Sequence, residues 1–157
     1  VIFADSVAIS DSETAGDLHD KLMVVGANLL VKTVKAIEAD DYNEVPQLQS
    51  EDLKSAPKIF KEFCKVNWNN TNQSVYNHIR GLSPYPTAFT ILNDKTLKIF
   101  NAEPESVKPE VEAGAYLTDN KTYLKFATKD GFIKLIDLQL EGKKRMLIDE
   151  FLRGVRL

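Results

Sequence analysis

Three cations in a row follow a predicted strand near the end of the chain. In the segment LQLEGKKRM, residues 138–146, Lys143, Lys144 and Arg145 come directly after Gly142. A flexible basic turn at the end of a rigid strand can hold phosphate groups through charge attraction and counterion release. The alternative is a solvated turn that only keeps the strand end soluble. The residue types therefore indicate either an RNA-binding loop or an ordinary polar one.

Other cations could extend such a surface. Arg80 ends a predicted helix, where it could reach a phosphate or simply complement the helix dipole. Residues 1–53 carry a net charge of −8 and residues 121–157 a net charge of +4, so a polyanion is expected near the C-terminal end. The sequence leaves open on which side of the sheet the remaining candidate lysines lie, which are Lys98, Lys121, Lys125 and Lys134.

Aromatic residues at strand spacing could stack on unpaired bases or pack in the core. The core is the favoured interpretation for Phe89, Tyr116, Tyr123, Phe126 and Phe132. Tyr85 stands between Pro84 and Pro86, and we expect it to pack the turn that leads into the sheet.

Residues that could catalyse a reaction are few. The chain has no Walker loop and no GxGxxG, GxSxG or HExxH motif. His19 and His78 lie on separate predicted helices, and Cys64 has no cysteine partner for a disulfide or a zinc knuckle. We expect no catalytic residue, no cofactor-binding residue and no metal ligand here. The single cysteine, the lack of a charged-then-apolar leader and the lack of a long apolar run predict a cytoplasmic protein without a membrane span.

The first third of the chain predicts a strand, a long helix and a linker. Residues 1–9 are β-branched and aromatic, and residues 15–39 are helical, with Thr14 and Asp17 forming an acidic capping box. Residues 41–57 are polar, acidic and interrupted by prolines, as in a linker. The helix must bury its apolar stripe, and we expect a second copy or the C-terminal part to cover Leu18, Leu22, Val25, Leu29, Leu30, Val34 and Ile37.

The rest of the chain changes from helical to strand periodicity. After a short helical turn and an extended segment at 58–68, a helix is expected at 70–82, with Asn70 as its N-cap and Gly81 as its left-handed end. Strands are then predicted at 88–92, 97–100, 115–118, 122–128 and 132–140, the last with clean alternation. A final helix is predicted at 147–153. This pattern predicts a mainly β fold, a small OB-like β-barrel with flanking helices.

Four segments in order resemble the methionyl-tRNA formyltransferase family along the whole chain. They are ETAGDLHDKL (13–22), RGLSPYP (80–86), LQLEGKKRM (138–146) and FLRG (151–154). The resemblance implies that residues 1–40 are the last strand and helix of a truncated α/β catalytic domain. Residues 41–57 would then be the linker, and residues 58–157 an OB-like, tRNA-binding C-terminal domain.

The family is understood to transfer a formyl group from 10-formyltetrahydrofolate to methionyl initiator tRNA in translation initiation. No segment matches its Asn-x-His catalytic pattern. Asn77 and His78 are adjacent and belong to a different motif. The catalytic domain would lie upstream of Val1, and this chain alone should be inactive, without folate or metal. Expected partners are the initiator methionyl-tRNA, the missing catalytic domain and a second copy of the helix at 18–37. The alternative is the C-terminal interaction domain of a related formyl-folate or sugar-nucleotide formyltransferase, binding protein rather than RNA.

Overall fold

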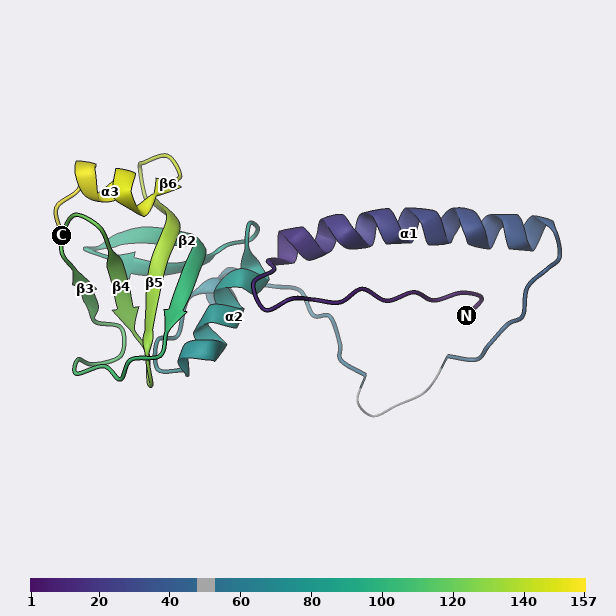
Figure 1. Ribbon diagram of the computed structural model, residues 1–157, viewed down its shortest axis with the longest axis horizontal. Helices are drawn as coiled ribbons and strands as arrows, with labels where there is room; N and C mark the ends of the chain where they lie inside the picture. The colour runs from purple at the N-terminus through teal and green to yellow at the C-terminus, as the bar shows by residue number, and fades with distance from the viewer. Residues whose placement is uncertain (48–52) are drawn as a thin grey trace. The chain divides into compact units, whose positions relative to one another are not determined.

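The computed structural model describes residues 1–47 and 53–157, so part of the predicted linker, residues 48–52, lies outside the described residues. The chain divides into two compact units, Val1–Lys58 and Ile59–Leu157. The first contains the helix α1 (Ala15–Glu38). The second contains a sheet with three short helices, η1 (Lys61–Cys64), α2 (Asn72–Leu82) and α3 (Ile148–Gly154) (Figure 1).

The N-terminal unit is a long helix with an extended segment beside it (Figure 1). The predicted capping box is confirmed, because Thr14 Oγ1 accepts from the Asp17 N–H while Asp17 accepts from the Thr14 N–H. The predicted strand at 1–9 is wrong, since this segment pairs with no strand among the described residues. It follows α1 instead, where the Lys21 ammonium lies 3.5 Å from the Ala8 carbonyl and that of Lys32 lies over the Phe3 ring.

The apolar stripe predicted on α1 is present. No residue of α1 is buried. Leu18, Val25 and Leu29 are half-buried, whereas the other apolar positions of the stripe are exposed, namely Leu22, Leu30, Val34 and Ile37. That a second copy or the C-terminal part covers this stripe stays a prediction.

The second unit is built on six antiparallel strands. These are β1 (Ala88–Leu92), β2 (Lys95–Glu105), β3 (Tyr116–Thr118), β4 (Leu124–Ala127), β5 (Phe132–Leu140) and β6 (Met146–Leu147). Their order is β1-β2-β5-β4-β3, with β6 beside β5, and the sheet is curled (Figure 1). The predicted mainly β class is confirmed as a mainly antiparallel sheet with a few helices. Among the described residues no ladder joins β1 to β3, so closure into an OB-like barrel stays a prediction.

The clean alternation predicted for residues 132–140 is wrong. The buried residues of β5 change phase along the strand. They are Phe132, Ile133, Leu135, Leu138 and Leu140. The pairing of β5 with β2 is irregular at the same level, between Ile99 and Ala102. An irregularity in a ladder bends the strands locally. Both strands therefore change the side that they turn toward the core.

The start and end of α2 also differ from the prediction. Its N-cap is Thr71, whose hydroxyl accepts from the Ser74 N–H at 3.3 Å, instead of Asn70. Gly81 lies inside the helix, and the chain leaves through Ser83 with extended backbone rather than through a left-handed residue. The Ser83 hydroxyl donates to the Phe100 carbonyl at 2.7 Å, which fixes this exit onto β2.

The core of the second unit lies between the sheet and its helices. Trp68 stacks on Phe126 with 4.7 Å between ring centroids and 7° between ring planes, and its indole N–H donates to Thr90 at 3.0 Å. Phe126 and Phe132 are buried, so the predicted core role of these two is confirmed. The other three aromatic residues predicted there are only partly buried, namely Phe89, Tyr116 and Tyr123.

Candidate nucleic-acid interface

The loop between β5 and β6 presents Lys143 and Lys144 to solvent. Gly142 adopts a φ of 78°, which glycine reaches without steric cost. The backbone that follows is fixed, because the Lys143 N–H donates to Leu140 and the Gln139 side chain donates to the Lys143 carbonyl, both at 2.9 Å. Within residues 1–47 and 53–157 no ion pair involves either lysine. The loop thus holds two available ammonium groups on an ordered turn.

Arg145 is held differently from the two lysines before it. Its guanidinium group donates to Asp137 from Nε at 2.9 and 3.0 Å and from Nη2 at 2.6 Å. It also lies over the Phe100 ring, 4.1 Å from the centroid. The bonds to Asp137 raise the pKa of Arg145 further, so the side chain stays charged while its charge is matched. Arg145 therefore ties the loop to the sheet, and its contact with RNA stays a prediction.

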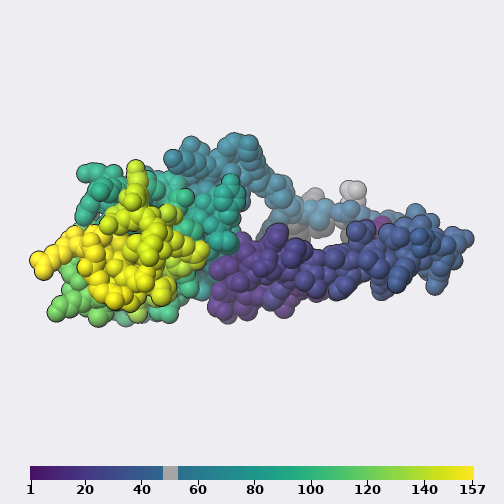
Figure 2. Space-filling view, turned by 90° about the horizontal axis from the view of Figure 1, so that it is seen from above, coloured from purple at the N-terminus to yellow at the C-terminus, as the bar shows by residue number. Residues whose placement is uncertain are grey.

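Lys98 belongs to the same surface as the loop. Its partners in the β ladders are Phe89 on β1 and Gln139 on β5. Directly opposed residues of neighbouring strands share one face of a sheet. Gln139, the ladder partner of Lys98, also donates a hydrogen bond to the Lys143 carbonyl. Its side chain therefore connects Lys98 with the basic loop. Figure 2 shows the segment after β5, in yellow, on the surface of the molecule.

Lys125 and Lys134 are paired with carboxylates. They oppose each other on β4 and β5. The Lys125 ammonium lies 2.6 Å from Glu105 and over the Phe132 ring, and that of Lys134 lies 3.8 Å from Glu103. Their charges are therefore matched by acids of β2. These two lysines are weaker candidates for a phosphate than the lysines of the loop.

The last two predicted cations come from other elements. Arg80 lies on α2, where its Nε donates to Asn77 at 2.8 Å. Lys121 lies in the β3–β4 turn, whose backbone N–H groups converge on Asp119. The Thr122 hydroxyl, together with those backbone N–H groups, holds the pKa of the Asp119 carboxyl well below its ordinary value. The eight predicted cations thus come from β2, β4, β5, α2 and two loops, and their contact with RNA stays a prediction.

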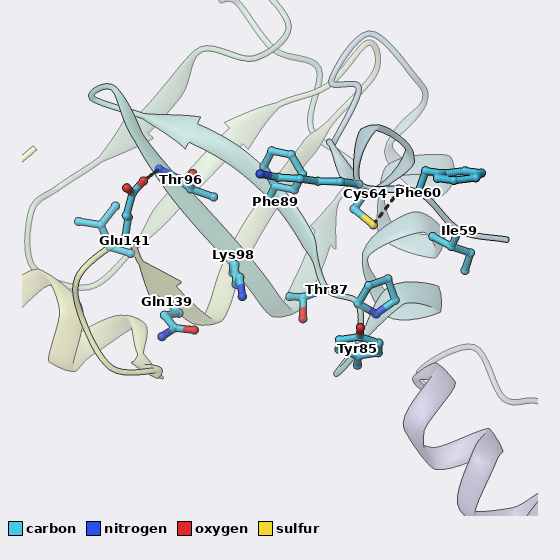
Figure 3. A pocket seen from close by; sticks show the side chains of 13 residues that line it. Ile59, Phe60, Cys64, Tyr85, Thr87, Phe89, Thr96, Lys98, Gln139 and Glu141 are labelled. Carbon is cyan, nitrogen blue, oxygen red and sulfur yellow. Dashed lines mark hydrogen bonds between the residues drawn. The ribbon is translucent and has the colours of Figure 1, made fainter.

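A groove beside Lys98 is a feature that sequence reasoning missed. It encloses about 600 Å³, and its lining comes from residues 59–61 with Cys64, from residues 85–87 with Phe89, and from β2 and the end of β5 at 96, 98 and 139–141 (Figure 3). Tyr85 is 86% exposed at its rim, so the prediction that Tyr85 packs the turn is wrong. The turn is held without it, because the Thr87 hydroxyl bonds the Pro84 carbonyl and Ser83 bonds β2. The sequence signal that could have predicted the groove is Tyr85, an aromatic residue between two prolines.

The histidines do not converge with acids or with Cys64 into a metal site. Among the described residues no group of three His, Cys, Asp or Glu side chains could hold a metal ion. His19 is exposed on α1 beside Asp20, at 3.1 Å. His78 is half-buried, with its ring 5.2 Å from that of Phe63. In the part of the chain that the structure describes, no helix has the length and apolar character needed to cross a bilayer.

We predict that His78 makes folding pH-dependent near neutrality. Burial lowers the pKa of His78 below its ordinary value of 6.5, with a hydrogen bond to the Cys64 backbone opposing the shift. The unfolded chain then binds the proton more readily, so stability falls as pH drops through about 6.5. His78→Gln should flatten the change in urea midpoint between about pH 7.5 and about pH 5.5. The exposed His19→Gln is the control, and an equal pH response in His78→Gln and the parent chain would contradict the assignment.

Comparison with known proteins supports the resemblance seen in the sequence. The family model described as formyl transferase, C-terminal domain, matches residues 58–156. A methionyl-tRNA formyltransferase of Phocaeicola vulgatus is 45% identical over 159 residues, covering 96% of this chain and 49% of the relative. One of Clostridium tetani is 35% identical over 157 residues, covering 100% of this chain and 50% of the relative. The chain spans about half the length of the curated relatives it matches.

Solved structures at low sequence identity share the fold. HypX from Aquifex aeolicus superimposes with a TM-score of 0.69 at 19% identity, over 97% of this chain and 28% of that one. A further HypX structure is a complex with tetrahydrofolic acid. WlaRD, a sugar 3N-formyltransferase, gives a TM-score of 0.58 at 20% identity, over 87% of this chain and 47% of that one. With a family match that spans most of the second unit, this chain belongs to the formyl transferase C-terminal domain family.

Proposed function

We propose that this chain is the C-terminal, tRNA-binding part of a cytoplasmic methionyl-tRNA formyltransferase. The family match and the 45% identity to a protein of that name support the proposal. The whole enzyme would transfer a formyl group from 10-formyltetrahydrofolate to methionyl initiator tRNA. Its catalytic residues would lie in the half of the relatives that this chain does not span. Residues 1–40 would end that catalytic domain, residues 41–57 would link it, and residues 58–157 would form the OB-like RNA-binding domain.

RNA binding is supported above all by the two available lysines of the β5–β6 loop. Lys143 and Lys144 stand on a backbone held by Gln139 and Leu140, and no ion pair of the described residues neutralises them. Lys98 adds a third ammonium group, on β2 directly opposite Gln139 of β5. A folded tRNA arm offers phosphates and shape, and three neighbouring ammonium groups suit phosphates along such an arm.

The salt dependence of tRNA binding tests this proposal. If the three lysines neutralise three phosphates, log affinity should fall with log salt at a slope of roughly −2 to −3. The affinity of the full chain for initiator tRNA, measured by filter binding, should then drop about 15- to 65-fold between about 50 and about 200 mM salt. Binding that is undetectable at low salt, or that ignores salt, would overturn the proposal.

A second candidate function is protein association, as in the interaction domain of a related formyl-folate or sugar-nucleotide formyltransferase. The observation that favours it is the exposed apolar stripe of α1, formed by Leu22, Leu30, Val34 and Ile37. A homodimer through this helix would bury the stripe. Light scattering across a dilution series would then show a dimer that dissociates, whereas a monomer at every concentration would exclude this homodimer.

A further inference from the structure

We propose that the groove beside Lys98 binds one unpaired nucleotide of an RNA, with the base stacked on Tyr85 and the phosphate against Lys98. The inference rests on the proposed RNA binding and adds a specific contact to it. The groove, of about 600 Å³, falls within the range of small-ligand sites, about 300–1,000 Å³. Its walls combine apolar and aromatic residues with a few polar groups, as such sites do.

The aromatic part of the groove is suited to a base. Tyr85 is 86% exposed and lies between Pro84 and Pro86. The two proline rings fix the backbone φ angle immediately before and after Tyr85. Phe60 and Phe89 also line the groove. An exposed aromatic ring stacks on any base, because every base has a π-face. Bases are available for this contact only where RNA is unpaired, as in loops, bulges and ends.

The polar part of the groove is suited to a phosphate and to the edge of a base. Figure 3 shows Lys98 between Tyr85 and Thr87 on one side and Gln139 on the other. Lys98 and Lys61 supply two positive charges to the lining. Thr87 and Gln139 add groups that donate or accept hydrogen bonds.

One carboxylate also lines the groove. Glu141 accepts from the Thr96 N–H at 2.9 Å, at the end of the groove far from Tyr85 (Figure 3). A phosphate would be repelled there, so it belongs beside Lys98, on the side of Tyr85. The repulsion gives the bound nucleotide a direction along the groove.

The groove is continuous with the candidate RNA interface. Gln139 lines the groove and donates to the carbonyl of Lys143 in the basic loop. A strand of RNA whose phosphates lie against Lys143 and Lys144 would therefore reach the groove across a single side chain. This continuity favours RNA over a protein segment as the occupant.

The test compares Tyr85→Ala and Tyr85→Trp in the full chain. The probes are a short single-stranded RNA and a base-paired RNA with the same number of phosphates. Tyr85→Ala should weaken single-stranded binding about 5- to 150-fold, the range for loss of one stacked base, and leave its salt slope unchanged. Binding of the base-paired RNA should be unaffected, and Tyr85→Trp should restore binding of the single strand.

Phe63→Ala is the matched control, because Phe63 is 59% exposed but does not line the groove. If Tyr85→Ala binds both RNAs as tightly as Phe63→Ala does, the groove does not bind a base and a protein segment could occupy it instead. In that case this inference fails, while the proposed function stands. If the parent chain binds neither these RNAs nor tRNA, the proposed function fails and the inference fails with it.

Discussion

Replacing Phe126 by alanine is expected to lower the free energy of unfolding by about 3–5 kcal/mol. Phe126 is 2% exposed, stacks on Trp68, and contacts Tyr116 with 6.0 Å between ring centroids. The substitution removes buried apolar area and leaves a cavity that the flat indole of Trp68 fills poorly. The free energy of unfolding of a small domain is about 5–15 kcal/mol in total, so this one substitution should remove a large share of the stability.

Urea unfolding followed by far-UV circular dichroism measures the effect. Trp68 is the only tryptophan, so its fluorescence reports the same core independently. Tyr85→Ala is the control: it also truncates an aromatic side chain, but an exposed one, and should change stability by less than about 0.5 kcal/mol. Equal midpoints for Phe126→Ala and Tyr85→Ala would show that the Trp68–Phe126 stack contributes little to folding.

Elements specified by local signals were predictable from the sequence. The capping box of α1 needs only Thr14 and Asp17, and the buried side of α2 follows from helical spacing. The strands at 88–92 and 132–140 have the predicted bounds because turn residues flank apolar runs. The other short elements, predicted at 115–118, 122–128 and 147–153, agree within one or two residues.

Features that depend on pairing between distant residues were not predictable. β2 extends to Glu105 instead of ending at residue 100. Its polar second half, which contains Pro104, has the composition of a loop, and only its pairing with β5 shows that it is a strand. The change of phase in β5 likewise follows from the irregular ladder with β2. Residues 1–9 have strand-forming side chains, yet a strand also needs a neighbour to bond with.

The same limit applies to the candidate site. Residue type identified the cations, but the acids that match three of them are set by the fold. Asp137 meets Arg145 across the loop, Glu105 meets Lys125 from β2, and Glu103 meets Lys134 in the ladder. The groove joins segments near residues 60, 85, 98 and 140, so no single stretch of sequence contains its signature.

Reversing the charge of both loop lysines, with Lys143→Glu and Lys144→Glu together, is expected to weaken tRNA binding about 100- to 1000-fold. A phosphate about 4 Å from an ammonium group in water is worth roughly 1 kcal/mol, and reversal replaces each attraction by a similar repulsion. The salt slope should fall toward roughly −1, because only one of three phosphate contacts remains. Arg145 is left in place, since it holds the loop to Asp137.

A matched variant separates a local contact from a general charge effect. Lys35→Glu with Lys108→Glu changes the net charge equally, and both residues are exposed and outside the β5–β6 loop. Filter binding at about 50 mM salt should show little loss for this control. Equal losses in the two variants would mean that tRNA responds to overall charge, and no loss in either would remove the loop from the interface. A selective loss in the loop variant, with an unchanged unfolding midpoint, leaves contact between these two ammonium groups and RNA phosphates as the physical cause.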